Sequence, residues 1–327
     1  MDRLLSNSRV LVTGGAGFIG SNLIESLLSS GNSVVCLDNF STGKRENIKD
    51  FLQTPGFKLI EGDIRNYDDC LNAVTGVEYV FHQAALGSVP RSIKDPVSTT
   101  DVNIGGFVKM LFASKEVGVK RFIYAASSST YGDHPDLPKV EDKIGKPLSP
   151  YGITKYVNEL FASNFASTYG IEVIGLRYFN VFGRRQDPDG AYAAVIPRFL
   201  KLLKNHTAPV INGDGSFSRD FTYIDNVLQA NHLAAIVTAK DAINQVFNVA
   251  HGERTTLNLL FNMIKEIAGR YDAEILKINP VHGPARGGDI PHSHASIEKA
   301  RNLLGYRPGK NVVEGLNEAV DWFWKHL

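Results

Sequence analysis

Cysteine, unbalanced charge and long apolar runs are all scarce in this 327-residue sequence. Cys36 and Cys70 are its two cysteines, which is too few for a disulfide framework, and no CxxC pair or Cys/His cluster suggests zinc. No apolar stretch reaches the ~18 residues that a membrane-spanning helix needs. The N-terminal apolar run leads straight into glycines, unlike a signal peptide. We therefore expect a cytoplasmic protein with no metal and no membrane partner.

The balance of charge argues against a nucleic-acid partner. The 35 basic and 34 acidic side chains give a net charge of +1, so there is no broad positive field to attract a phosphate backbone. Hydrophobic residues make up 43% of the chain and charged residues 21%, as in ordinary globular proteins. At roughly 150 residues per domain, the length indicates two domains or one large sheet with a cap.

The first half of the chain alternates apolar runs with amphipathic segments. The runs that we expect to form strands are residues 9–13, 33–37, 57–60, 77–82, 121–126 and 172–178. The segments with helical spacing of apolar residues are 18–30, 67–74, 97–116 and 151–168. Continuous apolar strands separated by such helices are typical of a parallel sheet covered on both faces. We therefore predict an α/β fold with a doubly wound parallel (Rossmann) sheet.

A glycine-rich turn joins the first expected strand to the first expected helix. The letters TGGAGFIG at 13–20 contain the spacing GxGxxG, and read from Gly14 they also contain GxxGxxG. Glycines let the strand turn tightly, let the backbone approach a pyrophosphate, and let the helix pack against the strand. The helix N-terminus then offers N–H donors to the phosphates. No Gly-Lys-Ser/Thr follows, which excludes a Walker P-loop, so the turn predicts a dinucleotide site.

An acidic residue after the second expected strand selects between the dinucleotides. Asp38 stands at that position and is followed by Asn39. A carboxylate there can accept the adenosine ribose hydroxyls of NAD, whereas it would repel the 2′-phosphate of NADP. An arginine that could bind such a phosphate is missing at the next position. NAD is therefore the predicted cofactor.

Tyr151 and Lys155 lie four residues apart and so share one face of an expected helix. Tyrosine has a pKa of about 10, but a neighbouring ammonium and a positively charged nicotinamide would both favour the phenolate. We expect this to bring Tyr151 towards the neutral range in which a general base works best. Ser127, Ser128 and Ser129 follow an expected strand at the sheet edge that faces the ligand crevice. One of these hydroxyls could hydrogen-bond a substrate hydroxyl.

After residue 178 the pattern becomes polar and rich in turns, with helices expected near 193–204 and 257–268. The apolar run 246–249 is expected to return to the main sheet. We predict that residues 1–178 plus about 222–252 form an NAD-binding Rossmann domain. Residues from about 179 to 221, plus 253–327, are predicted to form a smaller, discontinuous substrate-binding lobe.

Together these motifs resemble the extended short-chain dehydrogenase/reductases, and within them the UDP-hexose 4-epimerases, most of all those acting on UDP-N-acetylglucosamine. The resemblance covers nearly the whole chain. The residues that carry it are the glycine turn, Asp38-Asn39, Gly62-Asp63-Ile64, His82-Gln83-Ala84-Ala85, Asn103, 127–132, 151–155, 177–180, Arg219-Asp220-Phe221 and Arg286-Gly287-Gly288-Asp289.

The resemblance implies a role for each matching residue. The residues that it assigns to NAD are Gly14, Gly17, Phe18, Ile19, Gly20, Asp38, Asn39, Asp63, Ile64, Ala84, Asn103, Tyr151, Lys155 and Tyr178. Those that it assigns to the UDP-sugar are Gly87, Ser88, Ser127, Ser128, Ser129, Tyr151, Asn180, Ala194, Val195, Asn212, Arg219, Arg286, Asp289 and Ser293. Ser127, Tyr151 and Lys155 are the implied catalytic residues, with Tyr151 as the base. Arg219 and Arg286 resemble a clamp on the diphosphate.

The implied reaction is reversible C4 epimerisation of a UDP-hexose through a 4-keto intermediate, with hydride passed to and from bound NAD. The alternatives are a 4,6-dehydratase, a 4-reductase or a non-catalytic NAD-binding protein. Related dehydratases place Asp-Glu directly after the catalytic Thr, where this chain has Ser128 and Ser129. A non-catalytic relative would be expected to lose Tyr151 and Lys155. The helices near 97–116 and 151–168 match the family's four-helix interface and imply a homodimer.

Three features bear on the choice of sugar. Residues 87–92 resemble a segment of epimerases that favour N-acetylated UDP-hexoses. Ser293 is small at a position where a tyrosine would crowd an acetamido group, and Ala194 is expected to form another small wall. Asn212 stands where the family often places an aromatic residue against uracil. These features favour UDP-GlcNAc and UDP-GalNAc, with UDP-glucose and UDP-glucuronate as alternatives.

Overall fold

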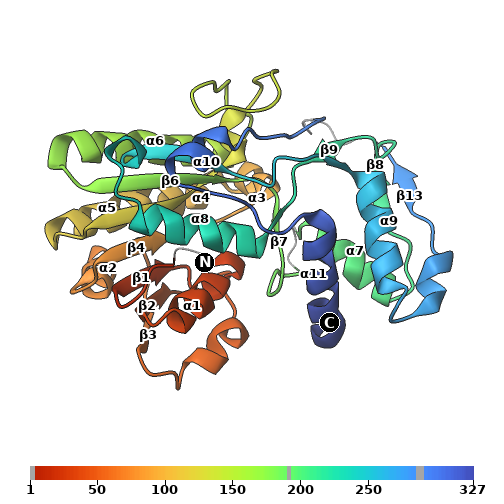
Figure 1. Cartoon of the computed structure of the whole chain (residues 1–327), viewed down its shortest axis with the longest axis horizontal. Helices are drawn as coiled ribbons and strands as arrows, with labels where there is room; N and C mark the ends of the chain where they lie inside the picture. Colours follow the sequence, from red (N-terminus) through yellow and green to blue (C-terminus); the bar gives the residue numbers. More distant parts are fainter. Residues whose placement is uncertain (1–3, 190–192, 285–290) are drawn as a thin grey trace.

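The computed structural model describes residues 4–189, 193–284 and 291–327 (Figure 1). Its centre is a seven-stranded sheet in the order β11-β6-β5-β4-β1-β2-β3. All pairs in this sheet are parallel. The strands are β1 (Arg9–Thr13), β2 (Ser33–Asp38), β3 (Phe57–Glu61), β4 (Tyr79–His82), β5 (Arg121–Ser127), β6 (Glu172–Tyr178) and β11 (Gln245–Val249). The predicted parallel sheet is confirmed, including the return of residues 246–249.

Helices cover both faces of the sheet, as the continuous apolar strands require. Along β1, Val10 and Val12 face one hydrophobic core, while Leu11 faces the other. Two of the helices that pack into the first core are α1 (Phe18–Ser29) and α8 (Ile224–Ile236). Those that pack into the second core are α2 (Tyr67–Val74), α5 (Phe107–Glu116) and α6 (Pro150–Tyr169). Helices on both faces of a parallel sheet make the fold doubly wound.

The helix expected over 97–116 is divided into three pieces. These are α4 (Pro96–Thr100), the π-helical turn η2 (Asp101–Gly106) and α5. Within the turn, the Asn103 amide donates to Thr154 Oγ1 at 3.1 Å and to the Leu86 carbonyl at 3.2 Å. These tertiary bonds hold the wider turn in place. A short helix, α3 (Val89–Lys94), precedes it.

Beyond the sheet, on the right in Figure 1, lie the helices α7 (Val195–Lys204), α9 (Leu257–Ala268) and α11 (Val312–His326). Helix α10 (Glu298–Leu303) packs instead against β11 of the main sheet. The short strands pair as β7 (Val181–Phe182) with β10 (Thr222–Tyr223), β8 (Val210–Asn212) with β13 (Val281–Gly283), and β9 (Ser218–Arg219) with β12 (Thr255–Thr256). The short 3₁₀ turns are η1 (Arg45–Phe51), η3 (Ser128–Tyr131), η4 (Lys240–Ala242) and η5 (Ala273–Lys277). The division into two lobes stays a prediction.

Across the ranges that the structure describes, no helix has both the length and the apolar character required to cross a bilayer. Nor do His, Cys, Asp and Glu side chains gather there in groups of three or more that could hold a metal ion.

Candidate active site

A cavity of about 670 Å³ lies at the carboxyl ends of the central strands. The strand order reverses at this point. From β1, the strands β2 and β3 follow on one side, and β4, β5, β6 and β11 follow on the other. Such a switch point is where open α/β sheets bind their ligands. The predicted site residues that line the cavity are Gly14, Gly17, Phe18, Ile19, Gly20, Asp38, Asn39, Asp63, Ile64, Ala84, Gly87, Ser88, Ser127, Tyr151, Lys155, Tyr178, Asn180 and Ala194.

The glycine turn leaves room for a ligand because side chains are missing from it. Gly14 has a φ of +65°, and a Cβ there would lie 2.8 Å from the backbone nitrogen of Ala84. A Cβ on Gly20 would collide with the Gly14 carbonyl oxygen. Gly17 caps α1 and has no side chain to occupy the free N–H groups of its first turn. This cradle fits a pyrophosphate, which the helix N-terminus would bind.

Asp38 ends β2 and is buried beside the glycine turn. Its carboxylate accepts hydrogen bonds from the backbone N–H groups of Ala16 and Phe40, both at 2.8 Å. Burial raises its pKa, and these two bonds act in the opposite direction. Gly43 packs so closely that a Cβ there would lie 2.9 Å from the Asp38 carboxylate. Asp38 is thus held rigidly at the place where its carboxylate would accept hydrogen bonds from the hydroxyls of an adenosine ribose.

A second acidic residue extends this end of the cavity. The Asp63 carboxylate accepts from the Asn39 amide at 2.8 Å and from Arg65 at 2.7 Å. The hydrogen bond from Arg65 is the largest cause that lowers the pKa of Asp63 to about 2. Asp63 is therefore ionised at neutral pH, and Asn39 is fixed against it.

Ser127, Tyr151 and Lys155 converge at the other end of the cavity. Ser127 is the last residue of β5, and Tyr151 and Lys155 lie one turn apart on α6. Ser149 caps this helix by accepting the Gly152 N–H at 3.1 Å. The Ser127 side chain lies beside Tyr151 and acts to lower its pKa. Lys155 is buried and donates to the Ala125 carbonyl at 2.8 Å. The structure thus brings the three implied catalytic residues together.

The electrostatics of this group differ from the expectation. Burial raises the pKa of Tyr151, and Ser127 offsets only part of that rise. Lys155 Nζ lies 5.9 Å from the centre of the Tyr151 ring and is engaged by the Ala125 carbonyl instead. Burial lowers the pKa of Lys155 to about 8. The protein's own groups therefore do not bring the pKa of Tyr151 towards neutrality, because the effect of desolvation outweighs that of Ser127.

Asn103 is buried and supports the cavity wall from behind. Its amide oxygen accepts the Leu86 N–H at 2.8 Å, and its amide nitrogen reaches Leu86 and Thr154. Asn103 therefore fixes the loop after β4 against α6 and is not among the residues that line the cavity. Ser128 and Ser129 begin η3, and Val195 begins α7 next to Ala194.

The other predicted substrate residues lie among the elements at the end of the sheet. Asn212 ends β8 and Arg219 ends β9. The Arg219 guanidinium donates to the carbonyls of Ser218 and Pro291 at 2.9 and 3.1 Å. Ser293 donates its N–H to the same Ser218 carbonyl at 3.0 Å. Arg219 and Ser293 are thus brought together, while Arg286 and Asp289 lie outside the described residues.

Several charged residues of the cavity wall were not predicted. They are Lys44, Arg65, Arg91, Arg185 and Asp187. Two of them belong to the turn-rich segment that follows β7, and Arg185 has a φ of +66°. A charged, turn-rich segment after a central strand is the signal that would have pointed to them.

Comparison with known proteins places these features in one family. The model of the NAD dependent epimerase/dehydratase family matches residues 10–250, which include the glycine turn, Asp38, Ser127, Tyr151 and Lys155. A UDP-glucose 4-epimerase of Mycolicibacterium smegmatis is 35% identical over 317 residues, covering 96% of this chain and 98% of the relative.

Two solved structures are similar over almost their whole length. One is the UDP-N-acetylglucosamine 4-epimerase from Methanobrevibacter ruminantium M1 in complex with UDP-N-acetylmuramic acid, with a TM-score of 0.91, 37% identity, and coverage of 99% of this chain and 100% of that one. The other is a UDP-glucuronic acid 4-epimerase from Bacillus cereus in complex with UDP-glucuronic acid and NAD, with a TM-score of 0.87, 32% identity, and coverage of 98% and 100%. The protein therefore belongs to the NAD dependent epimerase/dehydratase family.

Proposed function

We propose that this chain, an NAD-dependent 4-epimerase of UDP-sugars, interconverts UDP-GlcNAc and UDP-GalNAc. The observation that carries the reaction type is the convergence of Ser127, Tyr151 and Lys155 on a cavity that fits a dinucleotide. Relatives that act on UDP-glucose and UDP-glucuronic acid have a similar sequence or fold. The choice of an acetylated sugar therefore depends on the small residues of this chain.

The reaction requires a proton to leave the 4-hydroxyl of the sugar while C4 is oxidised to a ketone. The glycine turn and Asp38 would hold NAD, which would supply the acceptor and then the donor of the C4 hydride. Tyr151 takes the hydroxyl proton and gives it back in the second half of the reaction. Ser127 lies beside Tyr151 and acts to lower its pKa, which favours its deprotonated form. Lys155, fixed by the Ala125 carbonyl, keeps a cation one helical turn away.

A dehydratase would need a further acid and base to eliminate water from the sugar. Ser128 and Ser129 occupy the first turn of η3, where the related dehydratases have Asp-Glu, and neither hydroxyl can do that work. A 4-reductase would transfer hydride in one direction and consume NADH in proportion to sugar. The epimerase assignment predicts no net change in NADH.

The substrate assignment depends on Ser293 and Ala194. Ser293 is held beside Arg219 through the Ser218 carbonyl, and Ala194 lines the cavity with no more than a methyl group. Ala194 therefore leaves space in the cavity that a larger side chain would fill, and we propose that the small Ser293 leaves space for the sugar in the same way. We propose that this space accepts the acetamido group.

Ser293→Tyr is expected to lower kcat/KM for UDP-GlcNAc about tenfold more than for UDP-glucose, because a ring forced into an occupied space costs on the order of 1–3 kcal/mol. Ser293→Ala is the matched control and should keep the preference of the natural enzyme. The measurement is kcat/KM for both sugars with each variant. An equal loss for the two sugars would count against the assignment.

We also propose a homodimer that forms through the helices near residues 97–116, which include α4 and α5, and through α6. Val97 on α4 is 77% exposed, and Ile153, Leu160 and Phe161 on α6 are 48%, 52% and 36% exposed. Apolar side chains gathered on neighbouring helices are typical of an interaction surface, and α4 and α6 contact one another.

Leu160→Glu is expected to shift the protein to monomers in sedimentation velocity. A natural protein that sediments as a pure monomer would refute the homodimer.

The direct test of the proposed function is incubation of the purified protein with single UDP-sugars, followed by chromatographic separation of the products. We expect UDP-GlcNAc and UDP-GalNAc to give the same equilibrium mixture from either side. Conversion of UDP-glucose or UDP-glucuronate alone would move the assignment to those sugars. Accumulation or stoichiometric consumption of NADH would favour a reductase.

A further inference from the structure

Two segments on opposite sides of the glycine turn meet across the dinucleotide cavity. Residues 39–47 follow β2, and residues 183–189 follow β7. In the sheet, β2 lies on one side of β1, whereas β6, which leads into β7, lies beyond β4 on the other side. Lys44 Nζ and Asp187 Oδ1 are 2.8 Å apart and join the two segments. Both residues line the cavity.

The first segment is fastened to the glycine turn. Lys44 donates its backbone N–H to the Ala16 carbonyl at 3.0 Å. The Asn47 amide donates to the same carbonyl at 2.8 Å. Gly43 packs against Ala16 and the Asp38 carboxylate so closely that a Cβ would lie 2.8–2.9 Å from them. The backbone at Lys44 is therefore fixed, and only its side chain is left to move.

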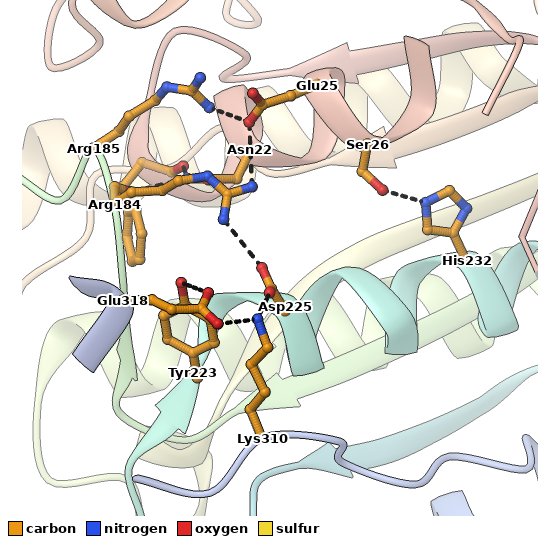
Figure 2. Close-up of polar contacts among 11 residues, drawn as sticks. Asn22, Glu25, Ser26, Arg184, Arg185, Tyr223, Asp225, His232, Lys310 and Glu318 are labelled. Atoms are coloured by element: carbon orange, nitrogen blue, oxygen red, sulfur yellow. Dashed lines mark hydrogen bonds and ion pairs between the residues drawn. The ribbon is translucent and has the colours of Figure 1, made fainter. Parts of the chain in front are cut away.

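The second segment is fastened to helix α1, whose N-terminus belongs to the dinucleotide site. Figure 2 shows Arg184 and Arg185 pointing to Glu25, at 3.2 and 2.8 Å, and the Asn22 amide reaching the Arg184 carbonyl at 3.0 Å. Arg184 also pairs with Asp225 on α8 at 3.1 Å. Arg185 keeps a left-handed φ of +66°, a conformation that persists only where the surroundings impose it.

We propose that Lys44 and Asp187 form a strap that closes the cavity and slows the release of NAD. The anchors of the two segments are partly buried, whereas the side chains of the strap are 48% and 40% exposed. The strap can therefore open without disturbing the contacts beneath it. An enzyme that returns its hydride to the same sugar needs a dinucleotide that stays bound throughout turnover.

The proposal depends on the dinucleotide site and not on the identity of the sugar. Its test measures the release of NAD directly, so its failure would leave the proposed substrate untouched. Protein loaded with radiolabelled NAD is chased with an excess of unlabelled NAD, and the bound label is followed over time. The variants are Lys44→Gln, Asp187→Asn and the charge-reversed pair Lys44→Asp/Asp187→Lys.

Both single variants are expected to release NAD about two- to fivefold faster than the natural protein, the range for one exposed ion pair. The charge-reversed pair should bring the rate back to within about twofold of the natural value. Raising the salt concentration should accelerate release from the natural protein and have a smaller effect on Asp187→Asn, because salt screens an exposed pair.

The two single variants separate a strap from simple attraction of phosphate. If Lys44 acted only as a positive charge near the phosphates, Lys44→Gln would accelerate release, but Asp187→Asn would slow it by removing a negative charge. That result, or unchanged release in either variant, would overturn the proposal. Lys325→Gln is the matched control, because it breaks an exposed 2.7 Å pair with Asp321 on α11. It should leave the release rate unchanged.

Discussion

Replacing Tyr151 by phenylalanine is expected to lower turnover at least ~100-fold, the usual contribution of a positioned general base. The change removes the one oxygen of this side chain and keeps the ring that packs at the start of α6. The change leaves the 4-hydroxyl of the sugar without the base that would take its proton. Ser127 would then lose the hydroxyl beside it.

The measurement for Tyr151→Phe is kcat with the UDP-sugar that the natural protein converts fastest, together with the amount of NAD bound per chain. Although Tyr151 is among the residues assigned to NAD, we expect most of the bound NAD to be kept, since the glycine turn and Asp38 remain intact elsewhere in the cavity. The matched control is Tyr156→Phe, one residue beyond Lys155 on the same helix. Its kcat should equal that of the natural protein. Rates close to those of the natural protein would reject Tyr151 as the base.

Arg177→Met is expected to lower the free energy of unfolding by ~3–5 kcal/mol, because it leaves a buried carboxylate without its partner. Arg177 on β6 binds Glu159 on α6 through two hydrogen bonds of 2.9 and 2.7 Å, and both side chains are buried. Its third donor reaches the Glu141 carbonyl at 2.9 Å, and its guanidinium lies 4.8 Å from the centre of the Tyr131 ring. The pair thus fastens the catalytic helix to the sheet.

The measurement is urea unfolding of Arg177→Met and two further variants. Arg301→Met breaks an exposed pair with Glu298 and should change the free energy of unfolding by less than ~1 kcal/mol. The double variant Arg177→Met/Glu159→Leu should recover most of the loss, because it removes the unpaired charge. A loss below ~1 kcal/mol for Arg177→Met would show that the buried pair adds little.

The main sheet could be predicted because its strands are recognisable from local patterns. Val10, Leu11 and Val12 are all fully buried, and such a continuous apolar run is typical of a strand covered on both faces. Helix α8 could not be predicted in the same way. It buries Asn231 and His232 among apolar neighbours, so no single polar face marks it.

The buried polar residues of α8 are satisfied by distant partners. Asn231 donates to the Tyr178 hydroxyl at 3.0 Å, and His232 contacts the Ser26 hydroxyl at 2.9 Å and the Leu5 N–H at 3.1 Å (Figure 2 shows the contact with Ser26). Partners that lie far away in the sequence leave no local signal. The π-helical turn at Asn103 escaped prediction for the same reason.

The candidate site also combines features that have a local signal in the sequence with features made by residues far apart in the chain. The glycine turn, Asp38 and the pair Tyr151 and Lys155 are local motifs, and the structure brings them to one cavity. The strap between Lys44 and Asp187 joins residues that are far apart in the chain, so only the fold could reveal it. The pKa of Tyr151 also depends on how deeply the fold buries it, which a sequence motif does not specify.

The central claim is that the hydrogen of C4 leaves the sugar and returns to the same carbon. It is tested most directly by converting a UDP-sugar that carries deuterium at C4 and analysing the product by mass spectrometry and NMR. We predict that the epimer keeps the deuterium at C4, with none passing to free NADH or to water. Loss of the deuterium from the epimer would contradict the account.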